Sequence, residues 1–165
     1  MEQKDRAKYF KHHKIIGIDP GATGGISVYS CDLKRIIEVT KMPSTPQELL
    51  SFLRIYKFNS VCYLEKVQGI PGAGGASQMF NFGRGFGQIE MALIANQIPF
   101  TEVMPQKWQK ELQLGHKGTK TKSQWKNKLK EKAQQCYPYL KKITLDVSDS
   151  LLIVEYGRLI ESNKL

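Results

Sequence analysis

The stretch Lys14–Gly25, KIIGIDPGATGG, decides the fold, because it places an acid where a buried strand gives way to glycine. Its isoleucines predict a strand inside a sheet, and Asp19 follows them directly before a Pro20-Gly21 turn. A carboxylate at this position is held rigidly and still faces solvent. Taken alone, Asp19 is better explained as a residue that hydrogen-bonds its own turn. Its importance depends on other acids further along the chain.

The composition is that of one domain with a polyanionic partner. The chain has 165 residues, 41% of them hydrophobic, which is enough for one core and too short for two. Residues 1–13 are expected to form a basic N-terminal arm, and residues 14–165 a single domain. The formal net charge of +10 favours a polyanion as partner.

The sequence carries no signal for a membrane or for export. It has no long apolar run, so no membrane partner is expected, and its first residues lack the apolar region of a secretory signal. Cys31, Cys62 and Cys136 are widely spaced, which indicates free thiols in a reducing compartment and argues against zinc. These features suit a cytoplasmic, nucleoid or virus-associated protein and leave an organelle open.

The first half of the chain places a second acid beside Asp19. Three further strands and one helix are predicted there: strands over 26–29, 36–39 and 60–67, and a helix over 47–57 capped by Ser44 or Thr45. The first three strands form an antiparallel meander. The strand that follows the helix is expected to be parallel to the first, because a helical crossover normally returns that way. Glu65, near the end of that strand, is therefore expected beside Asp19.

The second half contains a helix that is unusually rich in glycine. Its predicted elements are a glycine-rich loop over 68–76, a helix over 78–97 capped by Ser77, a fifth strand over 100–103, and helices over 123–135 and 146–160. Gly83, Gly85 and Gly87 lie inside the first helix, each at a cost of about 1 kcal/mol relative to alanine. Something must approach this helix closely. Packing on the sheet explains the glycines as well as contact with a second subunit or with nucleic acid.

The positive charge is concentrated in residues 105–142. This segment holds eleven lysines against two glutamates, which gives +9 of the net +10. Lysines on the outer face of a helix usually serve solubility, and this explanation is the default for Lys126, Lys128, Lys130 and Lys132. Lys117, Lys120 and Lys122 are clustered at a loop and a helix start, where they could grip phosphate.

Two further acids begin the last predicted helix. Asp146 and Asp149 are three residues apart and point to one side. Helix capping explains this pair, taken alone, better than catalysis does. If all four acids converge, however, they repel one another unless a divalent cation neutralises them. Mg²⁺ takes such oxygen ligands and also binds phosphate, and two ions could support in-line hydrolysis of a phosphodiester.

The order of elements matches a ribonuclease-H-like α/β fold, a five-stranded mixed sheet flanked by helices. Several motifs in order resemble the RuvC-type Holliday-junction resolvases, most closely the branch of phages, large DNA viruses and plastids: GIDPGATGG, YLEKV, GRGFGQIE, VMPQKWQK and DVSDSLLIVEYGR. The resemblance implies a homodimeric endonuclease, dependent on Mg²⁺ with Mn²⁺ as a substitute. Such an enzyme makes paired nicks across a four-way DNA junction.

The resemblance also assigns residues. It implies that the metal-binding and catalytic acids are Asp19, Glu65, Asp146 and Asp149, and that Lys122 contacts phosphate. Further DNA contacts are expected from Lys117, Lys120, Arg84 and Lys107. Family members insert an aromatic side chain at the crossover, for which Phe80 and Phe82 are candidates, although each is better explained as a core residue.

Two other functions stay open. IGIDPGATGG also looks like the first phosphate loop of sugar-kinase and actin-like ATPases, but those proteins need a second domain, for which 165 residues leave no room. A binding protein for branched nucleic acid without catalysis would use the acids only as caps and turn residues. No small-molecule cofactor is expected for the nuclease.

Overall fold

We describe the protein from a computed structural model, which places residues 13–67 and 75–163. One five-stranded sheet forms the centre, with the strands in the order β3-β2-β1-β4-β5. The strands are β1 (Lys14–Asp19), β2 (Gly25–Ser30), β3 (Arg35–Lys41), β4 (Ser60–Glu65) and β5 (Phe100–Val103). The first three strands pair antiparallel, whereas β4 is parallel to both β1 and β5. The predicted mixed sheet is confirmed.

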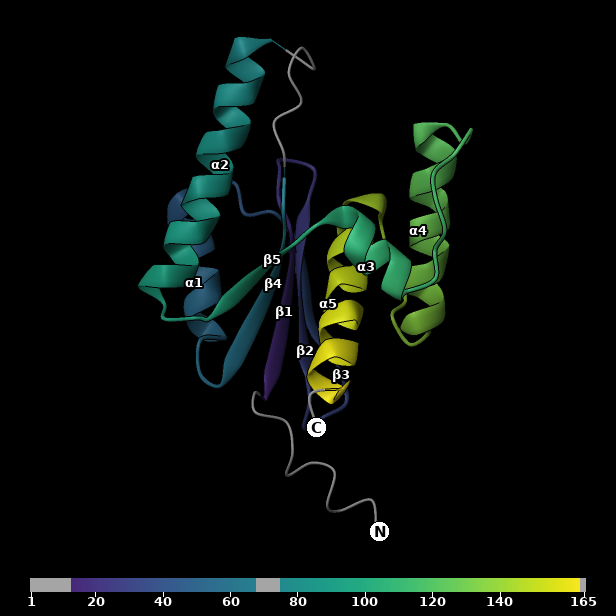
Figure 1. The fold of residues 1–165 in the computed structure, drawn as a ribbon. Coiled ribbons are helices and arrows are strands. Elements are labelled where there is room, and N and C mark those ends of the chain that lie inside the picture. The colour runs from purple at the N-terminus through teal and green to yellow at the C-terminus, as the bar shows by residue number, and fades with distance from the viewer. Residues whose placement is uncertain (1–12, 68–74, 164–165) are drawn as a thin grey trace, which may run out of the picture.

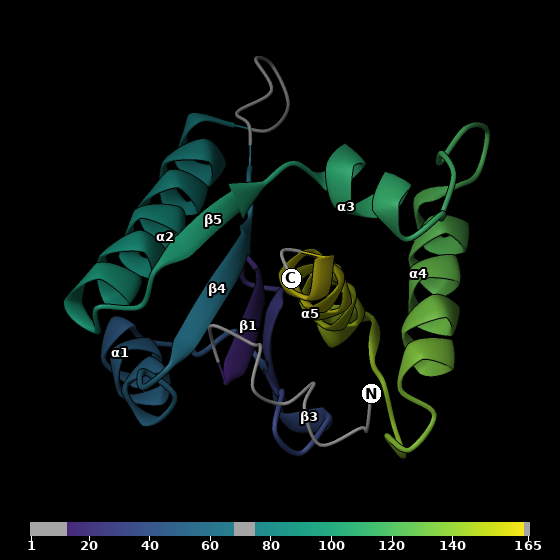
Figure 2. The same cartoon turned by 60° about the horizontal axis from the view of Figure 1, so that its bottom comes forward.

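Helices cover both faces of this sheet. They are α1 (Pro46–Ile55), α2 (Ala76–Ala95), α3 (Pro105–Glu111), α4 (Lys122–Cys136) and α5 (Leu145–Asn163). Figures 1 and 2 show α1 and α2 on one face, α5 on the other, and α4 outside α5. The alternation of side chains along β1 divides the core accordingly: Ile15 packs with α5, and Ile16 and Ile18 pack with α1 and α2.

The helix boundaries correct several details of the prediction. Thr45 caps α1, and its side chain forms a capping box with Glu48. The next helix, α2, begins at Ala76 with Gly75 as its N-cap, so the expected cap at Ser77 is wrong. The short helix α3 was not predicted. The expected N-terminal arm, except for His13, and most of the expected glycine-rich loop lie outside the described residues.

Gly17 lets α5 lie unusually close to the central strand. A Cβ atom at this position would lie 2.5 Å from the Ser150 carbonyl oxygen and 2.7 Å from the backbone nitrogen of Val154. Only glycine leaves room for this approach. Ser150 also hydrogen-bonds Ser27 of β2, with 2.7 Å between their hydroxyl oxygens. The start of α5 is thereby fixed against the sheet beside the end of β1.

The glycines of α2 have a different setting. A Cβ atom on Gly83, Gly85 or Gly87 would meet no described atom within 4 Å. Close packing on the sheet therefore does not explain them, and that half of the prediction is wrong. Of the predicted explanations, contact with a second subunit or with nucleic acid remains. In the described part of the chain no helix has the length and hydropathy needed to cross a membrane.

Candidate active site

Asp19 and Glu65 lie side by side where two parallel strands end. β1 and β4 are paired up to Ile18 and Leu64, and the two acids are the next residues of their strands. Both point to the face that α5 covers, and their side chains are in hydrogen-bonding contact. The strand pairing that the sequence predicts places these two carboxylates together.

Asp149 reaches the same point from the first turns of α5. Its side chain is buried, with 6% of the residue exposed, and its Oδ1 lies 3.0 Å from the hydroxyl of Ser148. The next residue is Ser150, which Gly17 allows to touch β1. The close approach of helix and strand is therefore the feature that brings Asp149 to Asp19. Three acids from β1, β4 and α5 form what we call the acid cluster: Asp19, Glu65 and Asp149.

The acid cluster is electrostatically strained. Burial, followed by the negative charges of Asp149 and Glu65, raises the pKa of Asp19 to about 9. Burial also raises the pKa of Glu65, although a hydrogen bond from Trp108 opposes the shift. Such shifts are typical of carboxylates gathered for function, since a fold gains nothing from burying like charges together.

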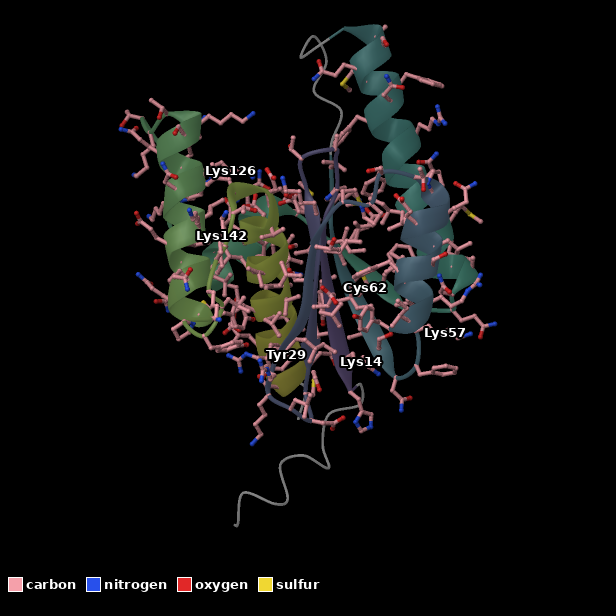
Figure 3. The ribbon with its side chains drawn as sticks, turned by 180° about the vertical axis from the view of Figure 1, so that it is seen from behind. Lys14, Tyr29, Lys57, Cys62, Lys126 and Lys142 are labelled. Carbon is pink, nitrogen blue, oxygen red and sulfur yellow. The ribbon has the colours of Figure 1, made fainter. Side chains whose placement is uncertain are left out.

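Lys126 of α4 supplies a positive charge to this cluster. Its Nζ lies 2.5 Å from Asp149 Oδ2, and the lysine side chain is only 32% exposed. Burial alone would lower the pKa of Lys126, but Asp149, Asp19 and Glu65 outweigh it and raise the pKa. Lys126 lies on the side of α4 that faces α5 (Figure 3). The prediction that Lys126 serves only solubility is therefore wrong.

Trp108 is a second residue that sequence reasoning did not single out. It is fully buried in α3, and its indole nitrogen donates a hydrogen bond of 3.0 Å to Glu65 Oε1. Its place within the VMPQKWQK motif was the signal available in the sequence. The hydrogen bond fixes the orientation of the Glu65 carboxylate and leaves its second oxygen for another partner.

Asp146, the fourth predicted acid, forms an ion pair with a different lysine. Because α5 begins at Leu145, Asp146 is within the first turn and is not the N-cap. Its Oδ2 pairs with Lys41 Nζ at 2.6 Å, and this pair is open to solvent, with the two side chains 31% and 69% exposed. The backbone of Asp146 nevertheless lies at the same end of the sheet, near Gly25.

The acid cluster has carboxylate oxygens but lacks the spacing of a formed metal site. Within residues 13–67 and 75–163, no three carboxylate, histidine or cysteine side chains stand together at metal-ligand spacing. Instead, lysine ammonium groups sit against Asp149 and Asp146. The chemistry of the acid cluster nevertheless fits a hard cation, because it offers buried carboxylate oxygens and already draws in positive charge.

The residues predicted to bind DNA lie on the surface. Lys107, Lys117, Lys120, Lys122 and Arg84 are all exposed. Phe80 is 69% exposed, so its prediction as a core residue is wrong. Phe82 is half-buried, and its ring lies 3.5 Å from the position that a Cβ atom on Gly21 would take. Whether these side chains contact DNA stays a prediction.

The fold is ribonuclease-H-like, and solved resolvases share it. RuvC of Thermus thermophilus, solved in complex with a Holliday junction substrate, superposes with a TM-score of 0.63 at 17% identity, covering 90% of this chain and 96% of that one. A second RuvC structure from this organism gives 0.58 at 19%, covering 90% and 97%. The yeast mitochondrial Holliday junction resolvase Ydc2 superposes less well, with a TM-score of 0.46 at 15% identity, covering 98% of this chain and 84% of that one.

Comparisons of sequence found nothing comparable. No family model and no curated protein matches this chain. Because the structural matches are below 20% identical, they show the fold alone.

Proposed function

We propose that this protein is a metal-dependent endonuclease that resolves four-way DNA junctions by paired nicks, of the branch found in phages, large DNA viruses and plastids. The observation that carries the proposal is the acid cluster of Asp19, Glu65 and Asp149 at one edge of a resolvase-like fold. The motifs that resemble the RuvC-type enzymes give this cluster its expected reaction.

The acid cluster would hold Mg²⁺, or Mn²⁺ in its place, with Asp146 as a further acid at its rim. When bound, two such ions activate a water and stabilise the leaving 3′-oxygen of a phosphodiester. The chain's own contribution is positioning. Trp108 orients Glu65 through its indole hydrogen bond, and the contact between Gly17 and Ser150 holds Asp149 at the end of β1.

The DNA would lie across the lysine-rich side of the cluster. Lys122 begins α4, four residues before Lys126, so the helix that reaches the acid cluster also presents a free lysine at its start. Lys117 and Lys120 extend this positive surface along the preceding loop. Contacts of this kind grip phosphates and position the duplex without reading its sequence.

Paired nicks require two such sites, and α2 offers the surface for a dimer. Phe80, Met91 and Ile94 are 69%, 60% and 56% exposed, and their spacing puts them on one side of the helix with Gly83 and Gly87 between them. A second copy of the chain would cover this stripe, and a two-fold axis would place the two sites on opposing strands.

Replacing single acids tests the nuclease. Asp19→Asn and Asp149→Asn should lower Mg²⁺-dependent nicking of a labelled four-way junction by about 10³-fold or more, because each removes a ligand from the acid cluster. Asp32→Asn is the matched control, since Asp32 is exposed and, among the described residues, forms an ion pair with His13 alone. Its nicking rate should equal that of the wild type.

The same assay separates the alternatives. Three-way, flap and linear substrates, with and without EDTA, measure the structure selectivity. Tight binding of the four-way junction that EDTA does not change, with no nicked product at any Mg²⁺ concentration, would establish a binding protein instead. Normal cutting by both acid variants would remove these residues from the reaction.

A further inference from the structure

Lys126 is the one feature of the site that the proposed function does not explain. A lysine that serves DNA would be expected to project into solvent, as Lys122 does one turn earlier. Lys126 instead points inward, beside Trp125, which packs in the core between α4 and α5. The Thr121–Gln124 capping box fixes where α4 begins and thus the level at which Lys126 meets α5.

The surroundings of Lys126 distinguish it from an ordinary surface ion pair. Asp149 is 8% exposed in its side chain and Lys126 is 32% exposed, whereas in the Asp146–Lys41 pair the values are 31% and 69%. Exposed pairs contribute little because water competes for both partners. A half-buried lysine beside three acids belongs to the site in the absence of metal, since leaving those acids without a counter-charge would be costly.

Resting on the proposed function, we propose that Lys126 is an internal cation that competes with the divalent metal for Asp149. Without metal, its ammonium group neutralises the acid cluster. A divalent ion that uses Asp149 Oδ2 as a ligand competes with Lys126, because the two cations share one oxygen and repel each other at that separation. The metal site is then weaker than its three acids alone would make it.

The displaced ammonium group has an obvious second partner. Lys126 stands on the same helix as Lys122, on the side of the acid cluster proposed for the DNA, so a phosphodiester oxygen can replace Asp149 as its partner. Metal and DNA then help each other to bind, since each one removes the competition faced by the other. By thermodynamic linkage this coupling must be equal in both directions.

Binding of Mn²⁺ to the DNA-free protein, measured by calorimetry, tests the competition. Lys126→Met should tighten Mn²⁺ binding about tenfold by freeing Asp149. Lys130→Met is the matched control: Lys130 lies one turn further along α4 and makes no ion pair with a described residue. This control removes the same charge and should change the affinity less than about twofold. Lys126→Arg keeps the cation and should stay close to the wild type.

Junction affinity provides the second measurement. Removing Lys126 should weaken binding of the four-way junction in Ca²⁺, under conditions where no product forms, more than it does in EDTA, where the lysine is engaged with Asp149. Thermal unfolding in EDTA verifies that the variants are folded.

The outcomes separate this inference from the proposed function. If wild-type protein and Lys126→Met bind no Mn²⁺ at all, either alone or with junction DNA, the metal-dependent nuclease is wrong. If the wild type binds Mn²⁺ but Lys126→Met binds it no more tightly than Lys130→Met does, the competition is wrong and the nuclease proposal stands.

Discussion

The two longest helices, α5 and α2, differ sharply in how many of their residues the rest of the chain buries. α5 has 19 residues and is enclosed between the sheet and α4, with a buried run from Val147 to Val154. α2 has 20 residues but buries only Ile89, Ala92 and Leu93, all in its second half. Figure 2 shows α5 in the middle of the molecule and α2 at its edge.

The difference shows which helix is packed within this chain and which one leaves a surface exposed. The helix that carries Asp149 obtains its packing from this chain, and glycine at position 17 permits the contact. In the first half of α2, Phe80 is 69% exposed and a Cβ atom on Gly83 or Gly85 would meet no described atom, as expected for a helix that binds a partner. Three substitutions break or sharpen this comparison.

Gly17→Ala should have the largest effect. The added methyl group meets the backbone of Ser150 and Val154, which cannot move without shifting α5 away from β1. We expect a loss of about 3 kcal/mol in the free energy of unfolding, at the upper end for overpacking in a core. Because Asp149 shifts along with Ser150, nicking should fall even where the variant remains folded.

Gly83→Ala is the matched control in α2. The added methyl group meets no described atom, so helix propensity alone should raise the stability of the monomer by about 0.5–1 kcal/mol. Urea unfolding of both variants, at a protein concentration low enough to keep the chain monomeric, measures the contrast. Equal effects of the two substitutions would refute the distinction between the helices.

Met91→Glu tests what covers α2. Met91 is 60% exposed in the apolar stripe, so a carboxylate there should cost the folded monomer little. In a dimer the charge would be buried without a partner, which we expect to weaken association by about 2 kcal/mol, or some thirtyfold. Sedimentation velocity measures this shift. A wild-type protein that is monomeric at micromolar concentration, alone and on junction DNA, would contradict the dimer.

Much of the fold could be predicted because its elements carry strong local patterns. The isoleucines of β1, the alternation along β4 and the capping signal at Thr45 each depend on neighbours in the sequence. The adjacency of Asp19 and Glu65 could be predicted because a helical crossover normally returns the chain parallel to the first strand, as β4 is to β1. The helix α3 was missed because seven residues, PQKWQKE, contain a single apolar side chain and show no periodicity.

The role of Lys126 could not be predicted, because it depends on a contact between two helices. Lys126 and Lys130 each follow an inward-facing residue of α4, Trp125 and Leu129, so the sequence treats them alike. Only the level of Asp149 on the neighbouring helix separates them. For the glycines of α2, the sequence predicted a close approach but not what approaches. The structure shows that the sheet does not come close to them.

Asp19→Asn should make the metal-free protein more stable. In the unfolded chain Asp19 loses its proton above its ordinary pKa of 3.8, whereas in the folded chain it keeps it up to about 9. Between these values the folded state binds more protons, so rising pH costs stability. An asparagine at position 19 removes this penalty, because its neutral side chain lies beside the same neighbours, Glu65, Asp149 and Lys126, without a charge.

The advantage of the variant should therefore be absent near pH 4 and reach about 1 kcal/mol or more at pH 8, seen as a higher Tm in EDTA. Adding Mn²⁺ should reverse the order, because the ion stabilises only the protein that binds it. A Tm difference independent of pH would mean that Asp19 is not strained by its neighbours. The end of β1 would then be an ordinary turn, and the contact between Gly17 and Ser150 would serve packing alone.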